Sequence, residues 1–216
     1  MLVIMGSIGR IASLVLASVL AISAAACSSD PGAGGNASGG TNAGALSDGE
    51  EQFLRFTREE EKLARDVYRA IGAAHPSFAN VTSSEQNHMD AVATLLTRYG
   101  VADPALGKDA GDFTDGTIQK LYADLVTAGS ASPVAAPAVG VEIEELDIAD
   151  LERGKAQVTH GDIVTTMNNL TRGSRNHLRT FYSHLRGLGG SYTPKHLDRA
   201  SFDAIVGSAM ETGGPP

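Results

Sequence analysis

The sequence contains one cysteine, at position 27, and no tryptophan among its 216 residues. A single thiol excludes an internal disulfide, a cysteine-based zinc site and a cysteine-ligated iron–sulfur cluster. Aromatic residues make up only 5% of the chain, which argues against a nucleic-acid module that stacks bases on aromatic rings. The formal net charge is −8, from 17 basic and 25 acidic residues. Because an acidic chain lacks the positive surface that nucleic acid attracts, we expect no nucleic-acid partner.

The first 27 residues have the pattern of an export signal. Arg10 is their only charged residue, and the apolar run IASLVLASVLAISAAA follows it. This run is short and rich in small residues, which suits a signal better than a membrane-spanning helix. The tetrapeptide that ends in Cys27 resembles a bacterial lipobox, although alanine stands at position 24, where leucine is more usual. The resemblance implies a lipid on Cys27 and a membrane-anchored protein that faces the periplasm or exterior. An ordinary secretion signal with an incidental cysteine is the alternative.

The rest of the chain predicts a tether, one helical domain and a short tail. Residues 28–46 include six glycines and almost nothing that could be buried, so we expect a flexible tether there. Residues 47–210 are the expected domain, and residues 211–216 the expected disordered tail.

Within the domain, apolar residues recur with the helical period in four long segments, and no segment alternates with the period of a strand. The long helices are expected over residues 48–72, 77–99, 133–153 and 162–188, and two shorter ones over residues 115–127 and 201–210. Ser47 and Glu50 fit a capping box at the first start, and Pro133 is expected in the first turn of the third long helix. Four long helices with a long, helix-containing crossover between the second and third fit an all-α, ferritin-like four-helix bundle.

Polar residues interrupt the apolar stripe of the second long segment. Glu85 and His88 lie on the same helical face as Val81 and Val92. A buried, unpaired carboxylate costs several kcal/mol, so a partner is expected. A metal ion would serve, because the Glu-x-x-His spacing lets both side chains reach one ion. Taken singly, Glu85 also fits a capping box after Thr82, and His88 fits a hydrogen-bonded core histidine.

The apolar faces of the other three long segments also contain polar residues, at a similar position along each segment. His177 lies among apolar residues of the fourth long segment. Asp147 lies within the stripe of the third segment, and Glu144 lies at its border. The first segment carries Glu60 near the centre of its stripe and Glu61 at its edge. A solvated face would explain any one of these segments, but it explains four together poorly.

As a set, these motifs resemble those of rubrerythrin-like proteins. Residues 61–68 resemble their first-helix Glu-x-x-Ala-x-x-aromatic-Tyr pattern, and residues 84–88 resemble their Glu-x-x-His motif. Residues 140–151 resemble the glutamate segment of the third helix, and residues 173–178 take the place of the second Glu-x-x-His motif. Over residues 47–206 the chain resembles an uncharacterised ferritin-like family of bacteria and archaea.

The resemblance implies a carboxylate/histidine di-iron site. Its matching ligands are Glu61, Glu85, His88, Glu144 and His177. Ser174 stands where the second bridging glutamate belongs, and Asp147 resembles an extra carboxylate of rubrerythrins and is the sixth expected ligand. Because Ser174 stands there, the sequence leaves open whether the site holds two loosely bound irons, holds one metal or is an inactive relic. It also leaves open whether the ligand from the first long segment is Glu60 or Glu61. Carboxylate and imidazole ligands suit iron or manganese.

These inferences predict a lipid-anchored metalloprotein of the cell envelope with ferroxidase or peroxidase activity. A non-catalytic helical module that binds metal for sensing or storage, or that binds another protein, is the alternative. A third reading is a structural bundle whose inward carboxylates pair with Arg65 or Arg175. The sequence leaves open whether the protein is an enzyme, whether it forms a homodimer and which protein partner it has.

Overall fold

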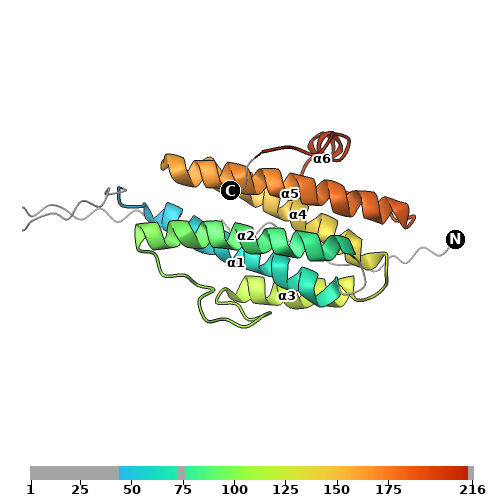
Figure 1. Ribbon diagram of the computed structural model, residues 1–216, viewed down its shortest axis with the longest axis horizontal. Coiled ribbons are helices and arrows are strands. Elements are labelled where there is room, and N and C mark those ends of the chain that lie inside the picture. Colours follow the sequence, from blue (N-terminus) through green and yellow to red (C-terminus); the bar gives the residue numbers. More distant parts are fainter. Residues whose placement is uncertain (1–43, 73–75, 214–216) are drawn as a thin grey trace, which may run out of the picture. The chain divides into compact units, whose positions relative to one another are not determined.

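The structure is a computed structural model that describes residues 44–72 and 76–213. Within these ranges the chain is all-helical, with six helices and no strand (Figure 1). Cys27, the expected signal and most of the expected tether lie outside the described residues. Among the helices that are described, none is both long enough and apolar enough to cross a membrane.

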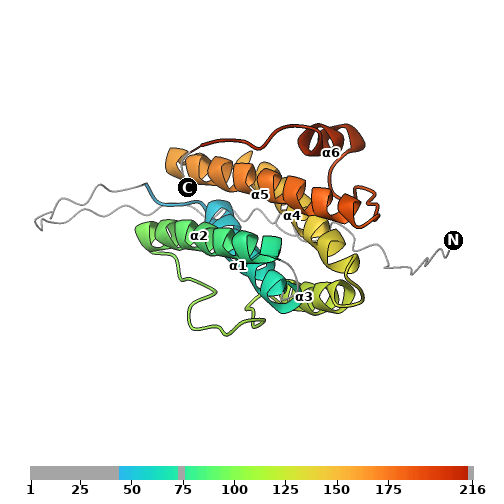
Figure 2. The same ribbon diagram turned by 45° about the vertical axis from the view of Figure 1, so that its right-hand side comes forward.

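Four of the helices are long and two are short. In chain order they are α1 (Asp48–Ile71), α2 (Pro76–Tyr99), α3 (Gly116–Gly129), α4 (Ala135–Lys155), α5 (Gly161–Gly187) and α6 (Arg199–Val206). The short helix α3 lies in the connection between α2 and α4 and packs against α1 and α4, whereas α6 packs against α5 (Figures 1 and 2). The long helices therefore form the body of the domain.

The ends of the helices mostly lie within two residues of the expected positions. The capping box is present at the start of α1, where the Ser47 side chain accepts from the Glu50 backbone and Glu50 accepts in return. Two expectations were wrong. Pro133 precedes α4, which begins at Ala135. The last helix spans residues 199–206, not 201–210, because Asp198 caps its start and the chain leaves the helix at Gly207.

Each neighbouring pair of long helices is antiparallel, because the residue numbers of the contacting residues rise along one helix and fall along the other. The contacts that show this are Arg58–Met89 and Arg65–Gln86 between α1 and α2, His88–Gly173 and Arg98–Asp162 between α2 and α5, Asp147–Ser174 and Lys155–Asn168 between α4 and α5, and Phe53–Gly154 and Tyr68–Glu144 between α1 and α4. The four long helices therefore enclose one common interior.

The interior contains two apolar clusters. One includes Val67, Phe78, Val141 and Phe181, and the other includes Leu54, Leu95, Leu151 and Met167. On all four long helices, the polar residues named in the sequence analysis fall between or beside the members of these clusters. A layer of polar side chains thus lies at the junction of the two apolar clusters.

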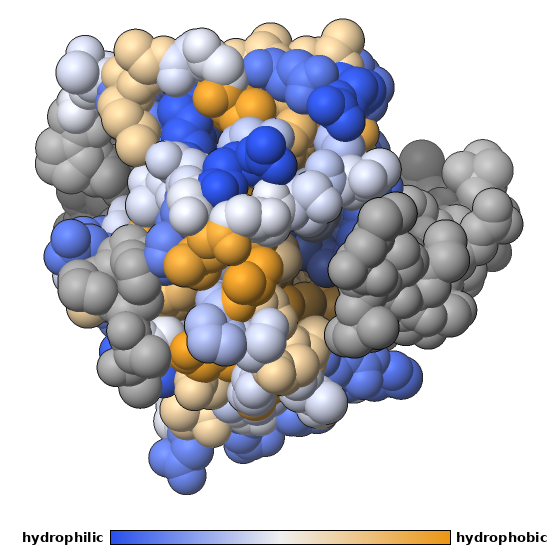
Figure 3. Space-filling view, turned by 90° about the vertical axis from the view of Figure 1, so that its right-hand side faces the viewer, coloured by the Kyte–Doolittle hydropathy of each residue, from blue (hydrophilic) through white to orange (hydrophobic). Residues whose placement is uncertain are grey.

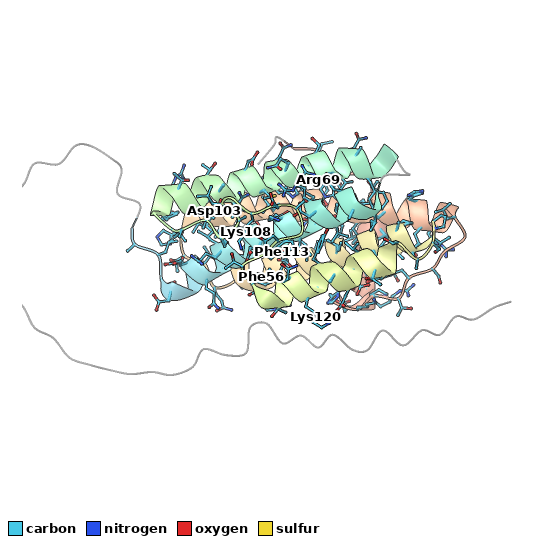
Figure 4. The ribbon with its side chains drawn as sticks, turned by 90° about the horizontal axis from the view of Figure 1, so that it is seen from below. Phe56, Arg69, Asp103, Lys108, Phe113 and Lys120 are labelled. Atoms are coloured by element: carbon cyan, nitrogen blue, oxygen red, sulfur yellow. The ribbon has the colours of Figure 1, made fainter. Side chains whose placement is uncertain are left out.

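The α2–α3 connection covers the outer face of α1 (Figure 4). Arg58 forms an ion pair with Asp103, and Lys62 forms one with Asp66 while it also donates to the Asp109 carbonyl. Glu59 accepts from two backbone N–H groups of the same connection. These buried charges on α1 therefore have partners, whereas Glu60 and Glu61 on its inner face each keep one oxygen without a hydrogen-bond partner.

Figure 3 shows apolar side chains that reach the surface in several groups at one end of the domain. Within the described part of the chain, the large exposed apolar residues are Leu106, Leu188 and Met210, which come from three separate segments. Isolated exposed residues of this kind are usual on protein surfaces. They give no ground for assigning a docking face.

We predict that Gly140→Ala lowers the free energy of unfolding. A Cβ at Gly140 would lie 2.6 Å from the Phe181 ring, so α4 and α5 must separate or the ring must move. Overpacking of this kind costs about 1–3 kcal/mol, which urea unfolding can measure. The control is Gly116→Ala, whose Cβ would meet nothing within 4 Å and which should be neutral or slightly stabilising. Equal stability of both variants would contradict the tight contact.

Candidate metal centre

Five polar side chains from all four long helices converge in the layer between the apolar clusters. Glu61 comes from α1, Glu85 and His88 from α2, Glu144 from α4 and His177 from α5, and all five are buried. Their donor atoms form two groups, each with all atoms within 4.8 Å of one another: Glu61, Glu85 and His88, and Glu85, Glu144 and His177. Residues that are far apart in the sequence thus meet as two three-donor groups.

Glu85 belongs to both groups. Its Oε2 lies 2.9 Å from His88 Nδ1, and its Oε1 lies 2.8 Å from His177 Nδ1. The two imidazole rings stack at an interplanar angle of 25°, with 5.5 Å between their centroids. Each carboxylate oxygen therefore faces a different imidazole, which is how a carboxylate is placed when it bridges two ions.

The two outer carboxylates complete a roughly symmetric arrangement. Glu61 Oε2 lies 3.2 Å from His88 Nδ1, and Glu144 Oε2 lies 3.5 Å from His177 Nδ1. Each half of the site thus offers one imidazole nitrogen, one terminal carboxylate and one oxygen of Glu85.

Several oxygen and nitrogen atoms that could bind a metal in this layer have no hydrogen-bond partner. They include Glu61 Oε1, Glu85 Oε1 and His177 Nδ1. The last two lie only 2.8 Å apart, yet their alignment does not make a hydrogen bond. Buried polar atoms without partners are rare because each costs about 1–3 kcal/mol. A cation between the donors would satisfy them, so the residues present fit a metal ion.

Two hydroxyl groups orient carboxylates at the edge of the site. The Tyr68 hydroxyl donates to Glu144 Oε1, and the Ser174 hydroxyl donates to Asp147 Oδ2. Tyr68 packs against Phe78 and Phe181, which holds its ring in place. Burial, followed by the nearby Glu144 charge, raises the pKa of Tyr68 well above its usual range, so the hydroxyl remains a donor.

The sixth expected ligand, Asp147, lies beside the two groups and belongs to neither. One of its oxygens accepts from Ser174, and the other has no hydrogen-bond partner. Of the two glutamates that the sequence left open, Glu61 joins the cluster and Glu60 does not. That the converging residues bind metal stays a prediction.

Arg65 and Arg175 do not neutralise the inward carboxylates. Arg65 pairs with Asp66 and Gln86, and Arg175 pairs with Glu211. The structural reading based on these arginines is therefore wrong.

The charges of the layer depend strongly on one another. Burial raises the pKa of Glu61 to about 7 against the opposing charge of His88, and burial together with the Glu85 charge raises the pKa of Glu144 to about 7. Burial alone would lower the pKa of His177, but Glu85 and Glu144 raise it to about 10. In the same way Glu61 and Glu85 overcome burial and hold the pKa of His88 well above its usual range. Without a metal, both imidazoles are therefore protonated at neutral pH.

Sequence reasoning missed Glu145 and the role of Gly173. Glu145 is fully buried because it accepts from the Tyr192 hydroxyl and from the backbone N–H groups of residues 195–197. Its apolar neighbour Leu146 is only partly buried. Gly173 gives room to the His88 ring, since a Cβ there would lie 2.5 Å from His88 Nε2. Neither role can be predicted from the helical spacing of the apolar residues.

We predict that metal binding releases protons and strengthens as the pH rises. A metal requires neutral imidazoles and ionised carboxylates, whereas the free site holds protons on His88 and His177 and partly on Glu61 and Glu144. Raising the pH from about 6 to about 8 should therefore lower the apparent Kd roughly tenfold per pH unit for each proton displaced. Calorimetry in two buffers of different ionisation enthalpy counts these protons. A Kd that does not change with pH would contradict the prediction.

Comparison with known proteins places the chain among uncharacterised relatives. Uncharacterized protein MJ0754 of Methanocaldococcus jannaschii is 41% identical over 170 residues, which cover 78% of this chain and 92% of that protein. The crystal structure of hypothetical protein MJ0754 from Methanococcus jannaschii is similar with a TM-score of 0.77 at 39% identity, over 80% of this chain and 100% of that chain. Residues 50–209 match the family described as "Uncharacterized protein domain (DUF2202)". The chain therefore belongs to the DUF2202 family.

Proposed function

We propose that the domain is a ferritin-like four-helix protein that binds two metal ions between Glu85 and the two histidines. The observation that carries this proposal is the position of Glu85, whose two oxygens face two different imidazole nitrogens. Each ion would be held by one histidine, one outer glutamate and one oxygen of Glu85. The antiparallel order of the four long helices supports the ferritin-like arrangement, because such bundles build di-metal sites from facing helices.

The donor set favours iron, with manganese as the next choice. Both metals accept mixed carboxylate and imidazole ligands. Bound iron would supply one-electron redox chemistry toward oxygen or peroxide. The chain itself does the rest: Tyr68 holds Glu144 in place, and the two apolar clusters keep water out of the layer.

We further propose a ferroxidase or peroxidase activity in the cell envelope, with the domain anchored through a lipid on Cys27. Support for catalysis comes from the number of protein donors. Three donors for each ion leave coordination positions free for a substrate, as catalytic metal sites require. Ser174, in the place of a second bridging carboxylate, adds to that openness.

The second candidate is a non-catalytic module that binds metal for storage or sensing. The pairing of Ser174 with Asp147 favours it, because this contact ties up a carboxylate that could otherwise strengthen the second metal position. Ferrous iron in air separates the two candidates. Metal bound without oxygen- or peroxide-dependent oxidation would support storage or sensing, whereas turnover would support the enzyme.

We predict that anaerobic titration with ferrous iron gives two ions per chain, and that Glu85→Gln weakens both positions at least about tenfold. The substitution keeps the side-chain volume but removes the charge that both ions share, and losing a charged ligand costs more than about 1.4 kcal/mol. Equilibrium dialysis with metal analysis measures this.

The matched control is Glu152→Gln, which removes an exposed charge from α4 and should bind like the wild type. Circular dichroism confirms that each variant is folded. Tight binding that survives in a folded Glu85→Gln variant would rule out the bridging role.

We also predict that Cys27→Ser moves the protein out of the detergent phase. A lipid on Cys27 would supply the membrane affinity, and among the helices that the structure describes none is apolar enough to replace it. Phase separation of the wild type and the variant after expression in a bacterium measures the change. The same detergent-phase fraction for both proteins would refute the anchor.

A further inference from the structure

Gly173 lies in the interior of α5, where the backbone itself does not require a glycine. Its conformation is helical, without the positive φ that Gly100 and Gly189 adopt. A glycine inside a helix destabilises that helix relative to alanine, because more backbone freedom is lost on folding. The missing side chain at this position therefore needs an explanation from what lies opposite.

The ring of His88 on α2 lies opposite Gly173. A Cβ at position 173 would stand 2.5 Å from His88 Nε2 and 2.7 Å from Cε1, but 3.9 Å from Cδ2. Carbon atoms in contact prefer separations of about 3.5–4.0 Å, so an alanine cannot coexist with the ring in this position. The outer edge of the imidazole, formed by Cε1 and Nε2, therefore uses the space that the glycine leaves.

The same ring presents its other nitrogen to the carboxylates of the centre. His88 Nδ1 lies 2.9 Å from Glu85 Oε2 and 3.2 Å from Glu61 Oε2. Nδ1 is bonded to the ring carbon that joins the side chain to the backbone. A histidine that offers Nδ1 therefore extends its outer edge beyond the ligand group, and that edge needs room. At His88 the room is supplied by the bare backbone of Gly173.

We propose that Gly173 is a positioning residue, which lets His88 face the centre with Nδ1 rather than Nε2. A side chain at position 173 would push the outer edge of the ring away from α5 and turn Nδ1 away from Glu61 and Glu85. The effect on metal binding rests on the proposed function of the centre. The contact between Gly173 and the ring can be tested without metal.

Gly140 offers a matched control for the same substitution. It lies inside α4, and a Cβ there would stand 2.6 Å from the Phe181 ring. Alanine at either position thus presses a methyl group into a ring at nearly the same distance, but Phe181 has no atom that binds metal. A variant that only overpacks the core should lose stability without losing an ion. Comparison of the two variants therefore isolates the effect on His88.

The first test is titration of the purified full chain with Co²⁺, followed by the visible absorption of the bound ion. Gly173→Ala should weaken one of the two positions at least about tenfold, as changes to groups that orient metal ligands do. Gly140→Ala should keep both positions at wild-type affinity. NMR of the wild type with labelled histidine and the NMR-active cadmium isotope should show coupling to His88 Nδ1, and Gly173→Ala should lose this coupling.

The second test is a double-mutant cycle on the metal-free chain. Gly173→Ala should lower the urea midpoint of unfolding while His88 is present. In a His88→Ala background the ring is gone, so the same substitution should leave the midpoint unchanged or raise it, because alanine favours the helix. If Gly173→Ala does not fold by itself, the double variant should fold as well as His88→Ala does.

The other outcomes separate failure of this inference from failure of the centre. Two Co²⁺ ions at wild-type affinity in a folded Gly173→Ala variant overturn the inference, as does cadmium coupling to His88 Nε2 in the wild type. Equal loss of Co²⁺ in both alanine variants also overturns it, because binding would then follow stability alone. A wild type that binds no Co²⁺ overturns the centre, and the cycle then decides the contact: a midpoint lowered equally in both backgrounds overturns it.

Discussion

The structure depends on one constraint, which is the burial of three carboxylates and two imidazoles in a layer between two apolar clusters. Ionised groups in such a place cost several kcal/mol each unless they compensate one another. Here Glu85 lies between His88 and His177, so each imidazole shares its charge with the central carboxylate. This compensation is incomplete, because several donor atoms still have no hydrogen-bond partner. Four helices must hold their register for these groups to meet, so the site and the packing of the helices require one another.

Buried charges in this protein fall into two classes. Those on the outer faces of the helices are fully partnered: Lys62 binds Asp66, and Glu145 binds backbone N–H groups of the segment after α5. Those on the inner faces of α1 and α4 are only partly partnered, as Glu60 and Asp147 show. Residues of the first class attach connections to the helices. Residues of the second class keep at least one carboxylate oxygen without a hydrogen-bond partner.

The DUF2202 relation extends the fold to an archaeal protein without naming an activity. MJ0754 is 41% identical over 170 residues and has a similar crystal structure, and its name gives no activity. The chemistry of the polar layer must therefore be inferred from the carboxylate and imidazole groups in it. Oxygen and nitrogen donors in two adjoining groups are the ligand types that iron and manganese accept.

Local sequence patterns determined most of the secondary structure and half of the site. The helical period predicted all six helices, and the three-residue step from Glu85 to His88 placed both on one face, because these signals act within a single helix. The choice of Glu61 over Glu60 was not local: adjacent helical residues point about 100° apart, and only the position of α2 relative to α1 decides which one meets His88. The pairing of Asp147 with Ser174 and the burial of Glu145 were likewise decided by tertiary structure. Their partners lie 27 and about 50 residues away along the chain, and no period along one helix records which group another helix or loop will bring within hydrogen-bonding distance.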